Sequence, residues 1–260
     1  MLWRKCISKT KDSKGNGIVT PVGNKYGVAI VLVKDNKLGY GSIVRIVIRP
    51  KDAVAMPMIA AGNAFGVALK ANGTVYAWGW GQYGQLGNGY TTNSDDTDKY
   101  SYEKIYSAPV QVLNGEQTSE TGYLKEVVQI DAMGGTGRDG KNRFGTSLAV
   151  TESKEVYGWG NSLYGALGVK SSIVSKPVRV ATGISTAVQV AGGGKSGSDD
   201  WHVYSIGNTG YTYILKEDGT VSSLGYNVNG ELGNGAKVST TAVQEVSNLT
   251  EIMQVHLQAQ

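Results

Sequence analysis

Three short motifs in this 260-residue sequence have the residue types of nucleotide or metal sites. The run Gly79–Gly84 matches the Gly-x-Gly-x-x-Gly fingerprint of dinucleotide-binding proteins, but that fingerprint requires a following helix, and the glycine-rich run 84–89 does not favour one. Gly194-Lys195-Ser196 resembles the end of a phosphate-binding loop, but Gln189 stands where the first glycine of that loop belongs. Asp95-Asp96-Thr97-Asp98 lacks the alternating spacing and the glycine of a calcium loop. We therefore predict no cofactor and no metal ion.

Residues for acid–base or nucleophilic catalysis do not group along the sequence. His202 and His256 are the only histidines and Cys6 is the only cysteine, which excludes an internal disulfide and argues against a Cys/His metal cluster. No Ser-His-Asp order and no carboxylate pair with a dictated spacing is present. We predict that the chain is not an enzyme.

Composition argues against two further classes. The net charge of +4 is scattered, without a run of Lys or Arg that would suggest a nucleic-acid-binding tail. No segment approaches the roughly 20 apolar residues of a membrane helix. Residues 1–9 contain basic side chains but no apolar core of a secretory signal. Neither membrane insertion nor a nucleic-acid partner is expected.

Aromatic and basic side chains in the longest irregular segments are the remaining candidates for binding. Tyr, Trp and Arg dominate binding hot spots because they bury a large area at low entropic cost. The alternative interpretation is that these aromatic rings only hold long loops against the strands. The candidate binding residues are Tyr90, Tyr100, Tyr102, Tyr106, Arg138, Lys141, Arg143, Trp201, His202 and Tyr204.

A repeated frame must position these segments. A Gly-x-Leu-Gly sequence, here named the glycine turn, occurs at residues 84–87, 165–168 and 230–233. Each glycine turn begins 17 residues after a residue in an apolar run, and the shortest distances between successive landmarks sum to a period of about 50 residues. Every departure from that period is an insertion, of the kind that surface loops tolerate.

Each repeat contains four runs with strand character, and four short strands in about 50 residues are typical of a β-propeller blade. Asn72-Gly73 and Asp218-Gly219 predict tight turns between the second and third runs. We predict an all-β fold: a partial β-propeller of about three four-stranded blades plus an N-terminal β-hairpin segment. The predicted strands lie at residues 58–61, 66–70, 75–78 and 109–110, then 129–132, 147–151, 156–159 and 177–178, then 189–191, 212–216, 221–224 and 242–243.

The strand ends and the glycine turns are predicted to be structural. Their glycines permit a positive φ and a close approach between neighbouring blades, and the two tryptophans are expected to pack in the core or between blades. These residues are Trp78, Gly79, Gly84, Leu86, Gly87, Trp159, Gly160, Gly165, Leu167, Gly168, Gly225, Gly230, Leu232 and Gly233.

The segment from Val75 to Gly89, with its Trp-Gly and Tyr-Gly-Gln-Leu-Gly-Asn-Gly, resembles the regulator-of-chromosome-condensation repeat family. The resemblance covers residues 54 to 255 and weakens along the chain, since Ala166 replaces Gln85 in the second repeat and Leu224 replaces Trp78 in the third. It implies a seven-bladed propeller, of which this chain would supply an incomplete ring.

The predicted organisation is an N-terminal β segment with a linker at 1–53 and propeller repeats at 54–260. The repeats are expected at about 54–126, 127–186 and 187–251, with the start of a fourth at 252–260. Residues 26–34 and 42–49 predict a hairpin, which is similar to the tail of a bacterial immunoglobulin-like domain. We expect a piece of a longer multidomain protein; the alternative is a short protein whose N-terminal strands cap the open arc.

Most insertions are predicted at one end of the blades, here named the loop face. In a four-stranded antiparallel blade, the loops after the first and third strands leave from the same end. The insertions at 134–146, 194–211 and 88–108 are all loops of this kind, whereas the smaller insertion at 114–123 lies at the opposite end.

The sequence therefore predicts a non-enzymatic recognition module that binds a protein or glycan through the loop face. The tyrosine-rich, unevenly spaced repeats are similar to bacterial surface or secreted members of the family, one of which is a β-lactamase inhibitor, and this implies an extracellular or cell-surface location. One alternative is the guanine-nucleotide exchange and chromatin binding of eukaryotic members. Another is an architectural module that closes a ring by dimerisation, because open blade edges invite self-association.

Overall fold

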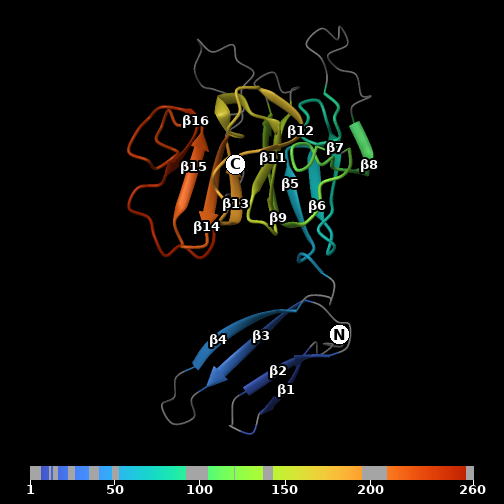
Figure 1. Cartoon of the computed structure of the whole chain (residues 1–260), viewed down its shortest axis with the longest axis vertical. Coiled ribbons are helices and arrows are strands. Elements are labelled where there is room, and N and C mark those ends of the chain that lie inside the picture. The colour runs from blue at the N-terminus through green and yellow to red at the C-terminus, as the bar shows by residue number, and fades with distance from the viewer. Residues whose placement is uncertain are drawn as a thin grey trace.

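The computed structural model is all-β and describes residues 7–11, 13, 17–22, 27–34, 41–48, 53–91, 105–119, 121–136, 143–194 and 210–255. Within these residues there are three four-stranded antiparallel sheets, two two-stranded sheets and a single 3-10 turn at Leu163–Gly165. Figure 1 shows the three larger sheets side by side, with the two hairpins of the N-terminal segment drawn apart from them. The predicted partial propeller is confirmed.

The N-terminal segment forms two hairpins. Strands β3 (Gly27–Lys34) and β4 (Gly41–Ile48) pair without a break along their whole length, as the Val- and Ile-rich runs predict. Strands β1 (Ile7–Lys11) and β2 (Gly17–Pro21) form an additional hairpin that the sequence pattern did not indicate, because its strands are short and polar. The relation to an immunoglobulin-like domain stays a prediction.

Each repeat folds as one sheet whose strand order follows the chain, so every turn joins neighbouring antiparallel strands. All twelve strands overlap the predicted runs. Blade 1 contains β5 (Met58–Gly62), β6 (Phe65–Leu69), β7 (Val75–Trp80) and β8 (Ile105–Gln111); blade 2 contains β9 (Val127–Thr136), β10 (Arg143–Thr151), β11 (Val156–Asn161) and β12 (Ile173–Arg179); blade 3 contains β13 (Ala187–Gly193), β14 (Tyr211–Lys216), β15 (Val221–Gly225) and β16 (Thr240–Glu245).

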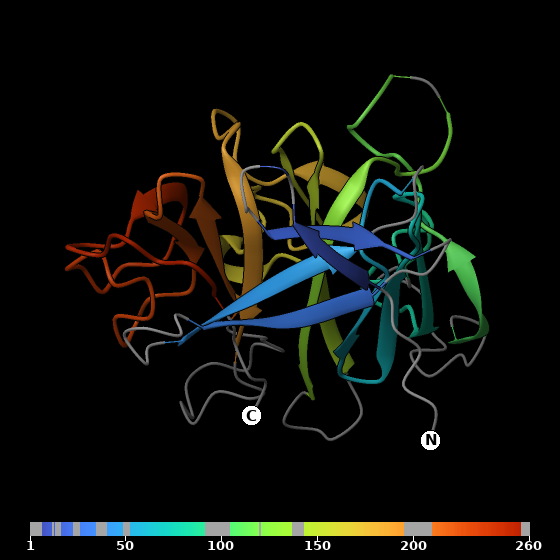
Figure 2. The ribbon, with the colours of Figure 1, turned by 90° about the horizontal axis from the view of Figure 1, so that it is seen from below.

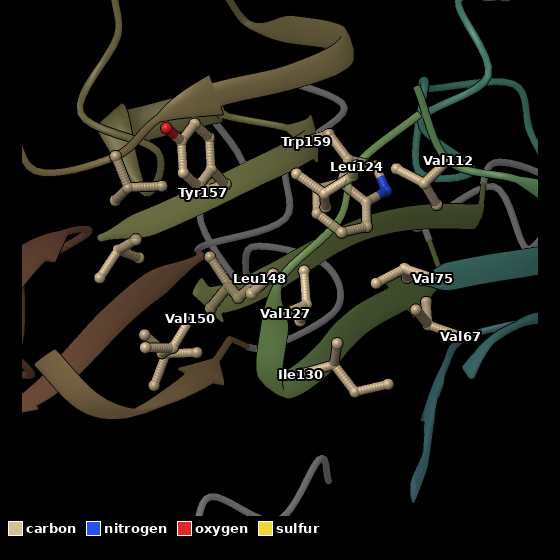
Figure 3. Close-up of a cluster of buried hydrophobic side chains, with 14 of the residues drawn as sticks. Val67, Val75, Val112, Leu124, Val127, Ile130, Leu148, Val150, Tyr157 and Trp159 are labelled. Carbon is tan, nitrogen blue, oxygen red and sulfur yellow. The ribbon is translucent and has the colours of Figure 1, made fainter. Parts of the chain in front are cut away.

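The blades fan around their first strands. β9 lies against both β5 and β13, and Figure 2 shows the three sheets as an open fan rather than a closed ring. The core fills the space between sheets: Val67, Ile130, Leu148 and Trp159 are all buried and come from two different blades. Figure 3 shows Trp159 of β11 beside Val112, which follows blade 1. Burial between blades therefore supplies much of the stabilisation.

The insertion predicted as a loop at 134–146 is largely strand. β9 and β10 continue their ladder to the pair Thr136 and Arg143, which leaves only residues 137–142 outside the described part of that hairpin. The prediction underestimated strand length because Gly134 and Gly135 weaken the strand signal. Gly134 is needed there, since a Cβ at this position would stand 2.4 Å from the Phe144 carbonyl oxygen.

The glycine turns join each blade to the next. A Cβ on Gly84 would lie 2.6 Å from the carbonyl oxygen of Val174 in blade 2, and one on Gly165 would lie 3.0 Å from the Cα of Thr241 in blade 3. Gly84 and Gly165 have φ of 78° and 86°, and all nine glycines of the three repeats named as structural have positive φ. At Gly84 and Gly165, any side chain larger than hydrogen would strain the backbone and push the two blades apart.

The carbonyl inside each of the first two glycine turns accepts hydrogen bonds from the next blade. The Gln85 carbonyl accepts from the Trp159 indole Nε1 at 3.0 Å and from the Ser147 hydroxyl at 2.9 Å. At the same place in the next pair of blades, the Thr212 hydroxyl donates to the Ala166 carbonyl at 2.8 Å. Leu224, which replaces the tryptophan in blade 3, cannot donate a second bond.

A glutamine near the start of the first strand clasps the following unit. The Gln129 amide donates from Nε2 to the Val190 carbonyl at 3.1 Å and accepts from the Val190 amide at Oε1 at 3.0 Å. Gln189 repeats both bonds with Val255, at 2.7 and 3.0 Å. This pair of hydrogen bonds, here named the glutamine clasp, fixes the position of one first strand along the segment that follows it in the next unit.

Candidate functional site

The loop face is the end of the fan from which the connections after the first and third strands leave. Seven of the ten candidate binding residues lie outside the described residues and are not placed: Tyr100, Tyr102, Arg138, Lys141, Trp201, His202 and Tyr204. The other three, Tyr90, Tyr106 and Arg143, are described. The binding role of the whole set stays a prediction.

Tyr90 is a large exposed aromatic side chain on a pinned turn. Its side chain is 58% exposed, and its backbone amide lies 3.3 Å from the Asn88 side-chain oxygen. The preceding Gly89 has a φ of 86° and donates its amide to the Ser175 carbonyl of blade 2. The turn is therefore tied to the neighbouring blade, which limits the entropy that Tyr90 would lose on binding.

Tyr106 and Arg143 lie in strands, not in the predicted loops. Tyr106 pairs with Gly79 in blade 1 and its partly buried ring packs against the core. Arg143 pairs with Thr136 near the end of β10, and its carbonyl accepts a hydrogen bond from the Gln85 amide at 3.0 Å. Tyr106 thus contributes to packing, whereas Arg143 remains partly exposed at the end of a ladder.

Aromatic pairs that the sequence pattern did not single out lie at the same end of the blades. Tyr83 contacts Phe144 across the boundary of blades 1 and 2, with ring centroids 4.5 Å apart. Tyr164 contacts Tyr226 across the next boundary at 5.0 Å, with the rings at 72°. Tyr83 and Tyr164 each stand directly before a glycine turn, so this shared frame position was the signal that could have identified them.

A further pair, Tyr211 and Tyr213, lies at the start of β14 with centroids 5.6 Å apart. Burial raises the pKa of both phenols above the ordinary value of 10.0, and the negative charge of Glu231 adds to the effect. Tyr213 donates its hydroxyl hydrogen to the Glu231 carbonyl. Both phenols are therefore neutral at physiological pH, and neither acts as an anion or a base.

No group of three His, Cys, Asp or Glu side chains is placed to hold a metal ion within the described ranges. No described helix is long and apolar enough to cross a membrane. The buried polar side chains that are described have structural partners: the amide of Asn227, for example, binds the Leu232 amide and the Ala236 carbonyl in its own loop. The chemistry that the described loop face offers is aromatic contact and hydrogen bonding.

The opposite end of blade 1 carries a polar hollow of about 260 Å³. The insertion at 114–123 forms its wall and is closed by a bridge between Leu113 and Tyr123. Tyr123 is 52% exposed. The lining residues are Thr74, Gln111, Asn114, Thr118, Thr121, Gly122, Tyr123, Leu124 and Lys125.

Comparison with known proteins supports the family to which the repeats point. Residues 72–132 and 154–196 match the family model for the regulator of chromosome condensation (RCC1) repeat. The chain is 25% identical to the Ultraviolet-B receptor UVR8 of Arabidopsis thaliana over 244 residues, which cover 79% of this chain and 50% of the receptor. It is 29% identical to the E3 ubiquitin-protein ligase HERC2 of Homo sapiens over 181 residues, which cover 69% of this chain and 3% of the ligase.

Among solved structures, the chain resembles Prp20p from Saccharomyces cerevisiae, with a TM-score of 0.51 and 19% identity. The likeness covers 83% of this chain and 44% of that chain. It shows the β-propeller fold. The chain spans about half the length of UVR8 and less than half of the Prp20p chain.

Proposed function

We propose that this chain is a non-enzymatic recognition module that binds a protein through the loop face of its blades. The observation that carries the proposal is Tyr90, which is 58% exposed on a turn tied to the neighbouring blade. Exposed aromatic side chains on rigid supports are typical anchors of protein interfaces. The aromatic pairs at both blade boundaries add rigid apolar surface at the same end.

The relatives support binding as the general role. Prp20p, which shares the fold, has binding properties toward Gsp1p and histones. The matched part of HERC2 is only 3% of a protein named as a ligase, so that name does not carry a catalytic role over to this chain. The extracellular or cell-surface location rests on the resemblance of the uneven, tyrosine-rich repeats to bacterial members, and cell fractionation would test it.

Photo-crosslinking from the loop face tests the proposal. A benzophenone amino acid replaces Tyr90 in one variant and Tyr123, which is 52% exposed at the opposite end, in a matched control. We expect irradiation in an extract of the source cells to label discrete protein bands from position 90 only. Wild-type protein should compete with this labelling, and Tyr90→Ala should compete at least tenfold less well. Identical bands from both positions, or none from position 90, would contradict a loop-face partner.

Nucleotide exchange on a small GTPase and histone binding form the competing proposal, and the shared fold with Prp20p supports it. Release of a fluorescent guanine nucleotide from a panel of small GTPases tests the first activity, and pull-down with purified histones tests the second. The recognition proposal expects neither acceleration nor histone capture at micromolar protein. A Tyr90-dependent signal in either assay would identify the protein partner instead.

A further inference from the structure

The polar hollow at the opposite end of blade 1 is a described cavity that the loop face does not include. It lies within the chain, at the connection from β8 to β9, and the insertion at 114–123 forms its wall. Its volume of about 260 Å³ is just below the roughly 300–1,000 Å³ of sites for drug-sized ligands. The hollow therefore has room for a small molecule of about one sugar ring.

The wall of the hollow is anchored on both sides. The Gln117 side chain binds both backbone groups of Lys125: its Nε2 donates to the carbonyl at 2.7 Å and its Oε1 accepts from the amide at 3.1 Å. A Cβ on Gly115 would stand 1.9 Å from the carbonyl oxygen of Pro177, so the loop also lies tight against blade 2. The hollow is therefore preorganised, which lowers the entropic cost of binding.

Three hydrogen-bond donors of the hollow lack a partner within the residues that the structure describes. They are the NH2 group of Gln111, the hydroxyl of Thr121 and the ammonium of Lys125. The side-chain acceptor of Gln111 is already used, since the Tyr76 hydroxyl donates to its Oε1 at 3.3 Å. A ligand that satisfies this set must therefore bring hydrogen-bond acceptors.

The charge that lines the hollow is positive in the described part of the chain. Lys125 lines it and no described carboxylate does. Glu116, in the same insertion, is bound to blade 2, because its Oε2 accepts from the Arg179 amide at 2.8 Å. A carboxylate on the ligand would meet an ammonium and neutral donors, which is the arrangement of charge-assisted hydrogen bonds.

Tyr123 adds an aromatic surface to the lining. Its side chain is 52% exposed, and the bridge to Leu113 fixes its backbone. The apolar face of a sugar ring can pack on such a side chain, whose hydroxyl also stays in contact with water. Thr74, Asn114 and Thr118 also line the hollow, and hydroxyl and carboxamide groups can both donate to and accept from sugar hydroxyls.

We propose that the hollow binds one acidic sugar residue, a hexuronate whose ring packs on Tyr123 and whose carboxylate accepts from Lys125, Gln111 and Thr121. This occupant combines a negative charge with an apolar ring face, whereas an acidic peptide side chain has only the first. The hollow and the loop face lie at opposite ends of the blades, so the inference does not depend on the proposed function.

Ligand-observed NMR titration of the whole chain tests this with probes that separate charge from ring. The probes are methyl glucuronide, methyl galacturonide, methyl glucoside, acetate and a capped aspartyl peptide. We expect at least one uronide to bind at least threefold more tightly than the glucoside, because only the uronide carries the carboxylate. Acetate and the peptide should bind more weakly than that uronide, because they cannot pack a ring on Tyr123.

Paired variants locate the binding in the hollow. Lys125→Met should weaken binding of the uronide at least threefold and leave that of the glucoside unchanged, whereas Lys237→Met, which removes the charge of an exposed lysine in blade 3, should change neither. Tyr123→Ala should weaken binding of the uronide and Tyr123→Phe should restore it. The melting temperature of each variant should match that of the wild type, because both side chains are exposed.

Four outcomes would overturn the proposal. The first is that neither uronide shows saturable binding, and the second is that the glucoside binds as tightly as both uronides. The third is equal weakening of uronide binding by Lys125→Met and Lys237→Met, since that pattern is nonspecific. The fourth is tighter binding of the capped aspartyl peptide than of either uronide, which would make the hollow a site for acidic peptides.

Discussion

At the scale of single residues, the conformational freedom of glycine serves two separate purposes in this chain. A positive φ shapes each glycine turn, and the missing side chain lets the next blade approach. Gly165 and Gly230 separate these purposes, because both have a φ near 90° but only Gly165 meets another blade, at Thr241. The pair therefore offers a direct measure of what close approach contributes to stability.

Alanine at each of these two positions should show the difference. Gly230→Ala is expected to cost about 1–2 kcal/mol of unfolding free energy, the usual penalty of a left-handed conformation. Gly165→Ala should cost at least about 1 kcal/mol more, because its Cβ would overlap the Thr241 backbone. Urea unfolding of the two variants and of the wild type measures both losses. Equal losses would show that the contact between blades accommodates the added methyl group without a further loss of unfolding free energy.

At the scale of elements, a glutamine side chain locks the first strand of blade 2 to that of blade 3, and a second one locks the first strand of blade 3 to residues 252–255. Gln129 satisfies both the amide and the carbonyl of Val190, and the same frame position in blade 1 is occupied by Met58, which can make neither bond. The clasp therefore joins neighbouring units and is not needed to form a first strand, since β5 pairs fully with β6 without it.

Gln129→Met should lower the unfolding free energy by about 1–3 kcal/mol, because two hydrogen bonds worth about 0.5–1.5 kcal/mol each are lost. Hydrogen exchange of the Val190 amide should accelerate, since Gln129 Oε1 accepts from it. Gln189→Met is the matched control: it removes the same pair of bonds to Val255, which lies in a segment without a paired strand, and should cost less. Unchanged protection of Val190 in Gln129→Met would contradict the clasp.

At the scale of the whole molecule, stability depends on keeping buried tyrosines neutral. Burial raises the pKa of Tyr157, Tyr211 and Tyr213 above 10.0. A folded-state pKa above the unfolded value stabilises the fold at pH below 10, and this contribution is lost as pH rises through the folded value. The free energy of unfolding should therefore fall steadily in alkaline solution.

Urea midpoints measured at a series of pH values from neutral to strongly alkaline should reveal this fall above a pH of about 10. Tyr213→Phe should reduce the steepness of the fall, because one of the raised phenols is then absent. It should also lower stability at neutral pH by about 1 kcal/mol, since the hydrogen bond to the Glu231 carbonyl is lost. A wild-type midpoint that does not change in alkaline solution would contradict this explanation.

The sequence by itself determined the repeat architecture of this protein. Local conformation is specified by the Asn72-Gly73 and Asp218-Gly219 turns, by the apolar runs and by the glycine turns. Because these signals recur at a constant period, few folds other than a β-propeller agree with all of them. All twelve blade strands and the β3–β4 hairpin were predictable for this reason. The strand extension at 134–136 and 143–146 was not, because the close approach of Asn63 and the Phe144 carbonyl, which explains Gly134, is visible only in the tertiary structure.

Only the tertiary structure decided which equivalent residues are covered. Ile59, Ile130 and Val190 read alike in sequence, and their different exposure follows from whether another blade stands in front of them. The same holds for the candidate site. Tyr90 and Tyr106 both lie in the same insertion, but Tyr106 pairs with Gly79 and packs against the core, whereas Tyr90 stays exposed. Burial is a property of neighbours distant in the chain, so a local pattern could not assign it.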